Sequence, residues 1–290
     1  MAAWLRLLRA ALFPTVAWDV LAGALLSGAG LDERLLPAAA SVLLLYHSGM
    51  ILNDWADRAP DAQHRPGRPI PSGRVSATAA LAAGLLLLLA GAAVAWLALP
   101  ADAAKAALLL AAIVLVYDLG RRPVRRWLGP VLLGVARALS LAFGGLAYFD
   151  SDVLSQRPVF VWAVAAYSCY FLMISRLATY EETGTVGQRG LSYVIAASAC
   201  PLLLTGVRDG SPLLFAGIAT LAAWLLPPAV RDATAEWPPA RVQSAVRRGL
   251  AGAPLVPAVA LLAAGLWPWA LLAPVVSLLV AWIARRLPPE

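Results

Sequence analysis

Long runs of apolar residues, separated by short charged turns, constrain the fold of this chain more than any other feature. Most of these runs have about the 20 residues that an α-helix needs to cross the hydrocarbon core of a bilayer. They show helix-length apolar stretches and lack the alternation that is typical of membrane barrel strands. The ten runs occupy approximately residues 10–29, 36–57, 75–99, 103–120, 127–149, 158–180, 189–207, 211–230, 245–264 and 267–285.

Composition supports the same fold class. Residues of the hydrophobic class make up 61% of the 290 residues and charged residues only 13%, whereas about a quarter of an ordinary soluble domain is charged. No linker rich in glycine and serine divides the chain. The sequence therefore predicts an all-α, polytopic membrane bundle that forms one domain over residues 1–290.

The net charge of +7 is distributed as a topology signal. Arginines gather in alternate turns and near both ends of the chain, while the remaining turns are acidic or neutral. Such a bias toward one side of the membrane predicts that both termini lie in the cytoplasm, with the chain in the inner (plasma) membrane. Because the basic residues sit in short turns between apolar runs, we expect the lipid bilayer as a partner and no nucleic acid.

One polar stretch directly follows the second apolar run. On a helix, Asn53 and Asp57 lie one turn apart with Asp54 beside them, and Asp61 follows Asp57 by four residues. Clustered carboxylates repel one another unless a cation neutralises them, and Mg²⁺ is commonly held by one or two carboxylates together with phosphate oxygens. Pro60 predicts that the helix ends near residue 59, which leaves Asp61 just beyond it.

Arginines follow this acidic stretch. Arg65 and Arg68 are spaced by prolines and a glycine, so the loop can fold back over the carboxylates. The planar guanidinium group matches phosphate oxygens in a two-pronged arrangement. Carboxylates, a metal and arginines together indicate a site for a diphosphate.

This stretch resembles the first aspartate-rich motif of the UbiA family of membrane prenyltransferases, NDxxDxxxD followed by an RPxRPIPSG-like loop. The resemblance implies a bundle of nine transmembrane helices, so we expect nine or ten. It also implies Mg²⁺-dependent transfer of an isoprenyl group from a prenyl diphosphate donor to an unidentified acceptor inside the membrane, with release of pyrophosphate. The matching residues are Asn53, Asp54, Asp57, Asp61, Arg65, Pro66, Arg68, Pro69, Ile70, Pro71, Ser72 and Gly73.

Tyr117 and Arg121 close the fourth run. Four residues apart, they lie on one helical face. They resemble the YxxxK motif of the same family, with arginine in place of lysine, and a cation there would stabilise the diphosphate as the allylic bond ionises. An interfacial tyrosine beside positive-inside arginines is the structural alternative.

The sixth run ends where most members of the family carry a second aspartate-rich motif. Here those aspartates are missing, and Arg176, Glu181 and Glu182 remain. The pattern resembles the divergent EboC-like branch. The glutamates could hold Mg²⁺ through longer side chains, Arg176 could neutralise phosphate without a metal, or the segment could be a solvated helix end.

Arg137 lies inside the fifth apolar run, where an unpaired guanidinium is costly. It is either a ligand for the diphosphate or the partner of an internal carboxylate, for which Asp19 is the candidate. The predicted site residues fall into three groups by role. The expected metal ligands are Asn53, Asp54, Asp57 and Asp61; the catalytic residues are Asp54, Asp57, Tyr117 and Arg121; the diphosphate-binding residues are Asn53, Arg65, Arg68, Arg121, Arg137, Arg176, Glu181 and Glu182.

Three other functions fit parts of the sequence. A non-catalytic carrier or transporter of a polyprenyl phosphate would keep the first motif and lose the second. A phosphotransferase with a CDP-alcohol donor also gathers aspartates at a membrane helix end, but its DGxxAR-type pattern is absent here. An ion-coupled channel would not explain the arginines that follow the acidic stretch.

Overall fold

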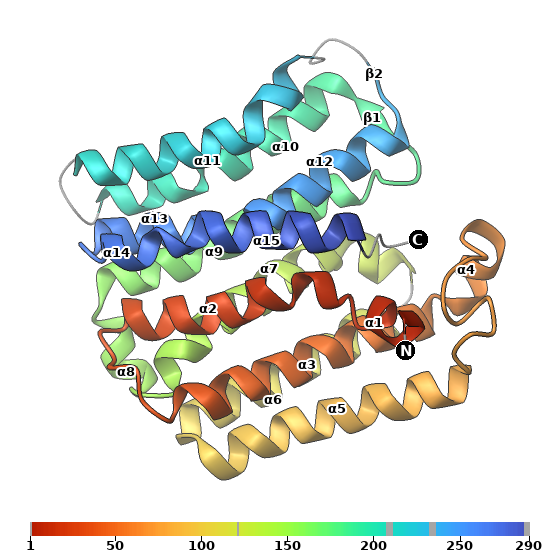
Figure 1. Ribbon diagram of the computed structural model, residues 1–290, viewed down its shortest axis with the longest axis horizontal. Helices are drawn as coiled ribbons and strands as arrows, with labels where there is room; N and C mark the ends of the chain where they lie inside the picture. Colours follow the sequence, from red (N-terminus) through yellow and green to blue (C-terminus); the bar gives the residue numbers. More distant parts are fainter. Residues whose placement is uncertain (1, 121, 207–210, 232–235, 287–290) are drawn as a thin grey trace.

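The computed structural model describes residues 2–120, 122–206, 211–231 and 236–286. Its long helices lie side by side and run alternately in opposite directions (Figure 1). The helices are α1 (Ala2–Leu7), η1 (Ala10–Leu12), α2 (Phe13–Leu26), α3 (Leu35–Ala56), α4 (Arg58–His64), α5 (Ala77–Ala98), α6 (Ala101–Leu119), α7 (Arg122–Leu146), α8 (Ser151–Ser155), α9 (Pro158–Ala178), α10 (Gly187–Ala199), η2 (Cys200–Gly206), α11 (Pro212–Val230), α12 (Pro239–Gly252), α13 (Leu255–Ala263), α14 (Trp267–Ala270) and α15 (Leu272–Arg286). Strands β1 (Thr185–Val186) and β2 (Glu236–Trp237) form one short antiparallel pair.

Seven helical segments among the described residues are long and apolar enough to cross a membrane. They comprise α3, α5, most of α7, α9, α11, the joined pair α12 and α13, and the joined pair α14 and α15. Helix α2 is apolar but shorter, and α6 has the length but carries Asp102, Lys105 and Asp118. The predicted all-α polytopic bundle is confirmed, and the count of nine or ten crossings stays a prediction.

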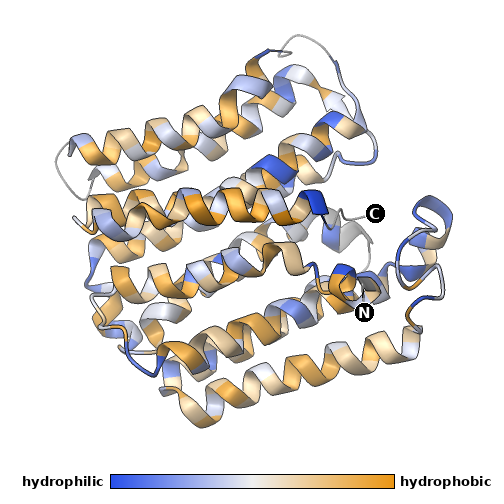
Figure 2. Ribbon diagram, in the orientation of Figure 1, coloured by the Kyte–Doolittle hydropathy of each residue, from blue (hydrophilic) through white to orange (hydrophobic). Residues whose placement is uncertain are grey.

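Large apolar side chains point outward along the bundle. Leu97 of α5 is 83% exposed and Val275 of α15 is 62% exposed, a degree of exposure that a water-facing surface would penalise. Figure 2 shows these helices as mainly hydrophobic, with hydrophilic residues gathered at α4 and at the beginning of α12. The protein is therefore a multi-pass membrane protein.

Helices α3 and α5 pack closely through small residues. The Ser41 hydroxyl donates to the Gly91 carbonyl at 2.7 Å, and the Ser48 hydroxyl donates to the Gly84 carbonyl at 2.8 Å. A side chain on either glycine would meet Leu45 or Leu52. Small residues let membrane helices approach until such hydrogen bonds form. This contact fixes the end of α3, which leads into the acidic stretch.

Candidate active site

The acidic stretch is built from two consecutive helices. Helix α3 ends at Ala56, Asp57 joins it to α4, and α4 runs from Arg58 to His64. The predicted helix end near residue 59 is wrong, because Pro60 falls in the first turn of α4, where a backbone N–H has no intrahelical partner to lose. Asp61 therefore lies within α4, and it is only 7% exposed.

Asp54 and Asp61 share one arginine from the following loop. The Arg68 guanidinium lies 2.6 Å from the Asp61 carboxylate and 3.5 Å from that of Asp54. Arg9, from the link between α1 and η1, reaches the same Asp54 oxygen at 3.3 Å. Burial raises the pKa of Asp61, and Arg68 opposes that rise. The loop folds back over the carboxylates, as the sequence predicts.

Asp57 faces a different arginine. Arg125 of α7 lies 2.5 and 2.9 Å from its two carboxylate oxygens, and the same guanidinium sits 5.1 Å from the centre of the Tyr117 ring. These contacts bring α6 and α7 to the acidic stretch. Arg121, which the sequence pairs with Tyr117, lies outside the described residues.

Asn53 contacts an acid from α6. Its amide donates to an Asp118 carboxylate oxygen at 3.2 Å, and Asp118 is 3% exposed. The second Asp118 oxygen is buried without a hydrogen-bond partner among the described residues. An orphaned carboxylate oxygen of this kind is costly, and a bound cation would relieve the cost.

The segment after α9 reaches the same end of the bundle. Arg65 lies 3.8 Å from Glu182, whose side chain is 73% exposed. Glu181 is less exposed, and burial raises its pKa, against the attraction of Arg65, Arg9, Arg247 and Arg68. Its carbonyl accepts a hydrogen bond from Gln243 of α12 at 3.2 Å. Glu181 thus lies in the electrostatic field of the arginines that contact Asp54.

Two other predicted arginines contact residues of α7 or of α2 and α9. The Arg176 guanidinium sits 5.8 Å from the centre of the Trp127 ring. Arg137 is 2.8 Å from Asp19 and donates to the Tyr167 hydroxyl at 2.9 Å, while that hydroxyl donates to Asp19 at 2.6 Å. Of the two roles considered for Arg137, the structure shows the ion pair with Asp19, and its role as a diphosphate ligand stays a prediction.

Sequence reasoning missed Arg9, Asp118 and Arg125 as members of this cluster. Arg9 and Arg125 counted only as positive-inside residues, and Asp118 lies inside the YxxxK-like segment without matching a fixed position of it. A signal did exist for Asp118, because an acid at the end of an apolar run must find a partner.

The donor groups suit Mg²⁺ without forming a complete site in advance. Among the described residues, no three histidine, cysteine, aspartate or glutamate side chains are grouped closely enough to hold a metal. Hard oxygen ligands are nevertheless present in Asn53, Asp54, Asp57, Asp61 and Asp118. This arrangement fits an ion that takes one or two carboxylates and completes its shell with phosphate and water.

Comparison with solved structures supports the fold. A structure described as that of a digeranylgeranylglyceryl phosphate synthase in membranes has a TM-score of 0.65 and 16% sequence identity, over 90% of this chain and 97% of the other. The apo structure of a UbiA homologue from Aeropyrum pernix K1 has a TM-score of 0.64 and 21% identity, over 88% and 98% of the two chains.

Sequence comparison identifies the family. A digeranylgeranylglyceryl phosphate synthase from Methanothrix thermoacetophila is 37% identical over 46% of this chain, and the match spans about half (50%) of that relative. The synthase of the same name from Metallosphaera sedula is 30% identical over 67% of this chain and 70% of its own length. The model of the UbiA prenyltransferase family matches residues 12–288. The chain therefore belongs to the UbiA prenyltransferase family.

Proposed function

We propose that the protein transfers an isoprenyl group from a prenyl diphosphate to an acceptor within the membrane and releases pyrophosphate. The observation that carries this proposal is the convergence of arginines from three separate segments on Asp54 of α3, Asp61 of α4 and Asp57 between the two helices. Arg9 and Arg68 contact Asp54, Arg68 contacts Asp61, and Arg125 contacts Asp57. Such a mixture of charges can bind a metal and a diphosphate at the same time.

The side chains divide the work by charge. Asn53, Asp54, Asp57 and Asp61, with Asp118, would hold Mg²⁺, and when bound this ion neutralises negative charge that develops on the leaving pyrophosphate. The phosphate oxygens that Mg²⁺ does not coordinate would be bound by Arg68 and Arg125, together with the predicted Arg65 and Arg121. Tyr117, whose ring centre is 5.1 Å from the Arg125 guanidinium, would face the allylic carbon of the bound donor. The roles of Arg176, Glu181 and Glu182 stay predictions of the sequence.

The reaction balances without an added oxidant or reductant. The bond between the allylic carbon and the diphosphate oxygen breaks, and pyrophosphate leaves with the electron pair. A nucleophilic atom of the acceptor then bonds to that carbon and loses its proton. Surrounding apolar helices keep water from capturing the cation first.

The relatives suggest which substrates to test. Several are named digeranylgeranylglyceryl phosphate synthase, and a chlorophyll synthase from Oryza sativa is 37% identical over 30% of this chain. We therefore propose geranylgeranyl diphosphate as the first donor and a prenylated glyceryl phosphate as the first acceptor. The arginine-rich end with α4 would face the cytoplasm.

The decisive assay measures pyrophosphate release and the prenylated product together. Purified protein with Mg²⁺, geranylgeranyl diphosphate and the acceptor should form both, and chelation with EDTA should stop both. Asp57→Asn should lower the rate at least about 100-fold. Asp152→Asn, in α8 at the opposite end of the bundle (Figure 1), is the matched control. Donor binding without release of pyrophosphate from the donor, whichever acceptor is supplied, would favour the non-catalytic carrier instead.

A further inference from the structure

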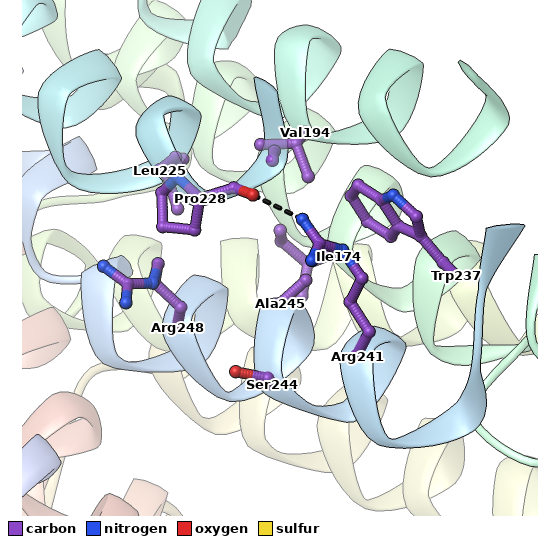
Figure 3. Close-up of a pocket in the computed structure, with 10 residues that line it drawn as sticks. Ile174, Val194, Leu225, Pro228, Trp237, Arg241, Ser244, Ala245 and Arg248 are labelled. Carbon is purple, nitrogen blue, oxygen red and sulfur yellow. Dashed lines mark hydrogen bonds between the residues drawn. The ribbon is translucent and has the colours of Figure 1, made fainter. Parts of the chain in front are cut away.

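A small basic cavity lies among α9, α10, α11, β2 and α12, and its lining includes none of the candidate active-site residues. Its volume is about 80 Å³, well above the roughly 10–15 Å³ that a single water requires, so it has room for a small anionic group. Arg241, Ser244 and Arg248 supply its polar wall, and Leu225, Pro228 and Trp237 are among its apolar neighbours (Figure 3).

The polar residues come from one face of α12. Arg241, Ser244 and Arg248 are spaced by three and four residues, which places them on successive turns of one side of a helix. Gln243, on another side, donates to the Glu181 carbonyl. Helix α12 therefore separates the cavity from the segment that approaches the acidic stretch.

Prolines in α11 explain part of this arrangement. Pro228 lacks a backbone N–H, so the Trp224 carbonyl loses its partner within the helix. Arg248 donates to that carbonyl at 3.4 Å, and Arg241 donates to the Pro228 carbonyl at 2.5 Å, as the dashed line in Figure 3 shows. A guanidinium has five N–H donors, so one long contact to a carbonyl leaves Arg248 with donors for a ligand.

Charge in the cavity is of one sign. Within the described part of the chain, the residues that line it include both arginines and no carboxylate. The Arg241 guanidinium lies 5.0 Å from the centre of the Trp237 ring, and Trp237 is 1% exposed. The arginine is thus held in position by a buried aromatic ring, and the cavity is suited to an anion.

The cavity's position favours a lipid over a soluble anion. It lies where α11 ends and α12 begins, at the same end of the bundle as α4 (Figure 1). Helix α11 also exposes large apolar side chains, with Phe215 at 50% and Val230 at 56%. Basic pockets between membrane helices at the cytoplasmic boundary are typical sites for anionic lipid headgroups.

We propose that this cavity binds the phosphodiester group of an anionic phospholipid. Arg241 and Arg248 contact the phosphate oxygens, Ser244 donates a hydrogen bond, and the acyl chains lie along the apolar surface of α11. This binding is independent of prenyl transfer and needs neither the donor nor Mg²⁺.

Native mass spectrometry of the full chain in detergent tests the proposal. With dioleoyl phosphatidylglycerol we expect one retained lipid per protein, and with dioleoyl phosphatidylcholine at the same concentration much less. Arg248→Gln should weaken phosphatidylglycerol binding about fivefold, the effect expected for one basic residue at an anionic headgroup. Arg241→Lys, which keeps the charge, should bind more tightly than Arg241→Gln.

Arg286→Gln is the matched control, since Arg286 ends α15 and does not line the cavity. It should bind phosphatidylglycerol like the unaltered protein. Equal binding by Arg248→Gln and Arg286→Gln overturns the proposal. So does full displacement of the lipid by inorganic phosphate at an equal concentration, which would identify a soluble-anion site.

Discussion

Arg125 donates from both terminal nitrogens of its guanidinium to the two carboxylate oxygens of Asp57, at 2.5 and 2.9 Å. The two residues are 68 positions apart in the sequence. A two-pronged pair of this kind fixes the orientation of both side chains as well as their distance. It ties the start of α7 to the joint between α3 and α4. In the sequence, Arg125 indicates only the membrane topology. In the structure, it is the direct partner of Asp57, a predicted metal ligand.

We predict that Arg125→Lys lowers pyrophosphate release about 100-fold, because a lysine ammonium cannot form both contacts that a guanidinium makes. The assay is initial-rate pyrophosphate release at saturating donor. Arg58→Lys serves as the control: Arg58 donates to the Trp55 carbonyl and stacks on the Trp55 ring, away from the carboxylates. Equal rates for the two variants would remove Arg125 from the site.

A second prediction separates the two roles considered for Arg137. Its replacement by methionine leaves the buried Asp19 without its cation, which should cost about 3–5 kcal/mol of stability. Asp19→Leu together with Arg137→Met should recover most of that loss, as measured by thermal unfolding in detergent. A raised KM for the donor in the stable double variant would instead support a diphosphate-binding role.

The acidic stretch illustrates what sequence spacing can and cannot predict. The position of Asp54 at the end of a helix, and the return of Arg68 over the carboxylates, follow from local periodicity and from the prolines of the loop, whereas the place of Asp61 within α4 does not. The joint at Asp57 does not, because Pro60 is compatible with both the end of one helix and the first turn of another. The sequence predicts that the acidic stretch is helical, but it does not predict where one helix ends and the next begins.

Partners from distant segments were harder to predict. Arg9 and Arg125 carry the same positive-inside signal as Arg58, and only the packing of the bundle distinguishes them. Asp118 meets Asn53 because α3 and α6 are neighbours, a relationship that no local pattern encodes. For Arg137 the sequence named Asp19 as the candidate partner, since few acids lie inside the apolar runs, but it did not distinguish that pairing from a role at the diphosphate.

Close packing of α2 against α7 gives a third prediction. A methyl group on Gly144 would collide with the Val20 carbonyl, whereas one on Gly30 would meet nothing within 4 Å. Overpacking of this kind should cost about 1–3 kcal/mol. Gly144→Ala should therefore lower the melting temperature while Gly30→Ala leaves it unchanged. Matching melting temperatures for both variants would show that the two helices can shift apart freely.

The last prediction concerns pH and uses Glu181. Burial raises the pKa of this carboxyl group in the folded protein, with Arg65 as the main opposing charge. Between its ordinary pKa of about 4.3 and the raised value, the folded state keeps a proton that the unfolded state has released. Stability contributed by this group must therefore fall as the pH rises through that window and then stay constant above it.

Thermal unfolding between pH 4 and pH 7 measures this effect. Glu181→Gln removes one titrating group and should reduce the slope of the profile in that range, and Asp61, whose pKa burial also raises, contributes to the slope that remains. Glu182→Gln is the matched control, because the Glu182 side chain is 73% exposed and an exposed carboxylate is largely screened by solvent. A profile that keeps its slope in Glu181→Gln, and loses it in Glu182→Gln, would mean that the neighbouring glutamate is the buried one. That result would also reverse which of the two glutamates faces the arginines around Asp54.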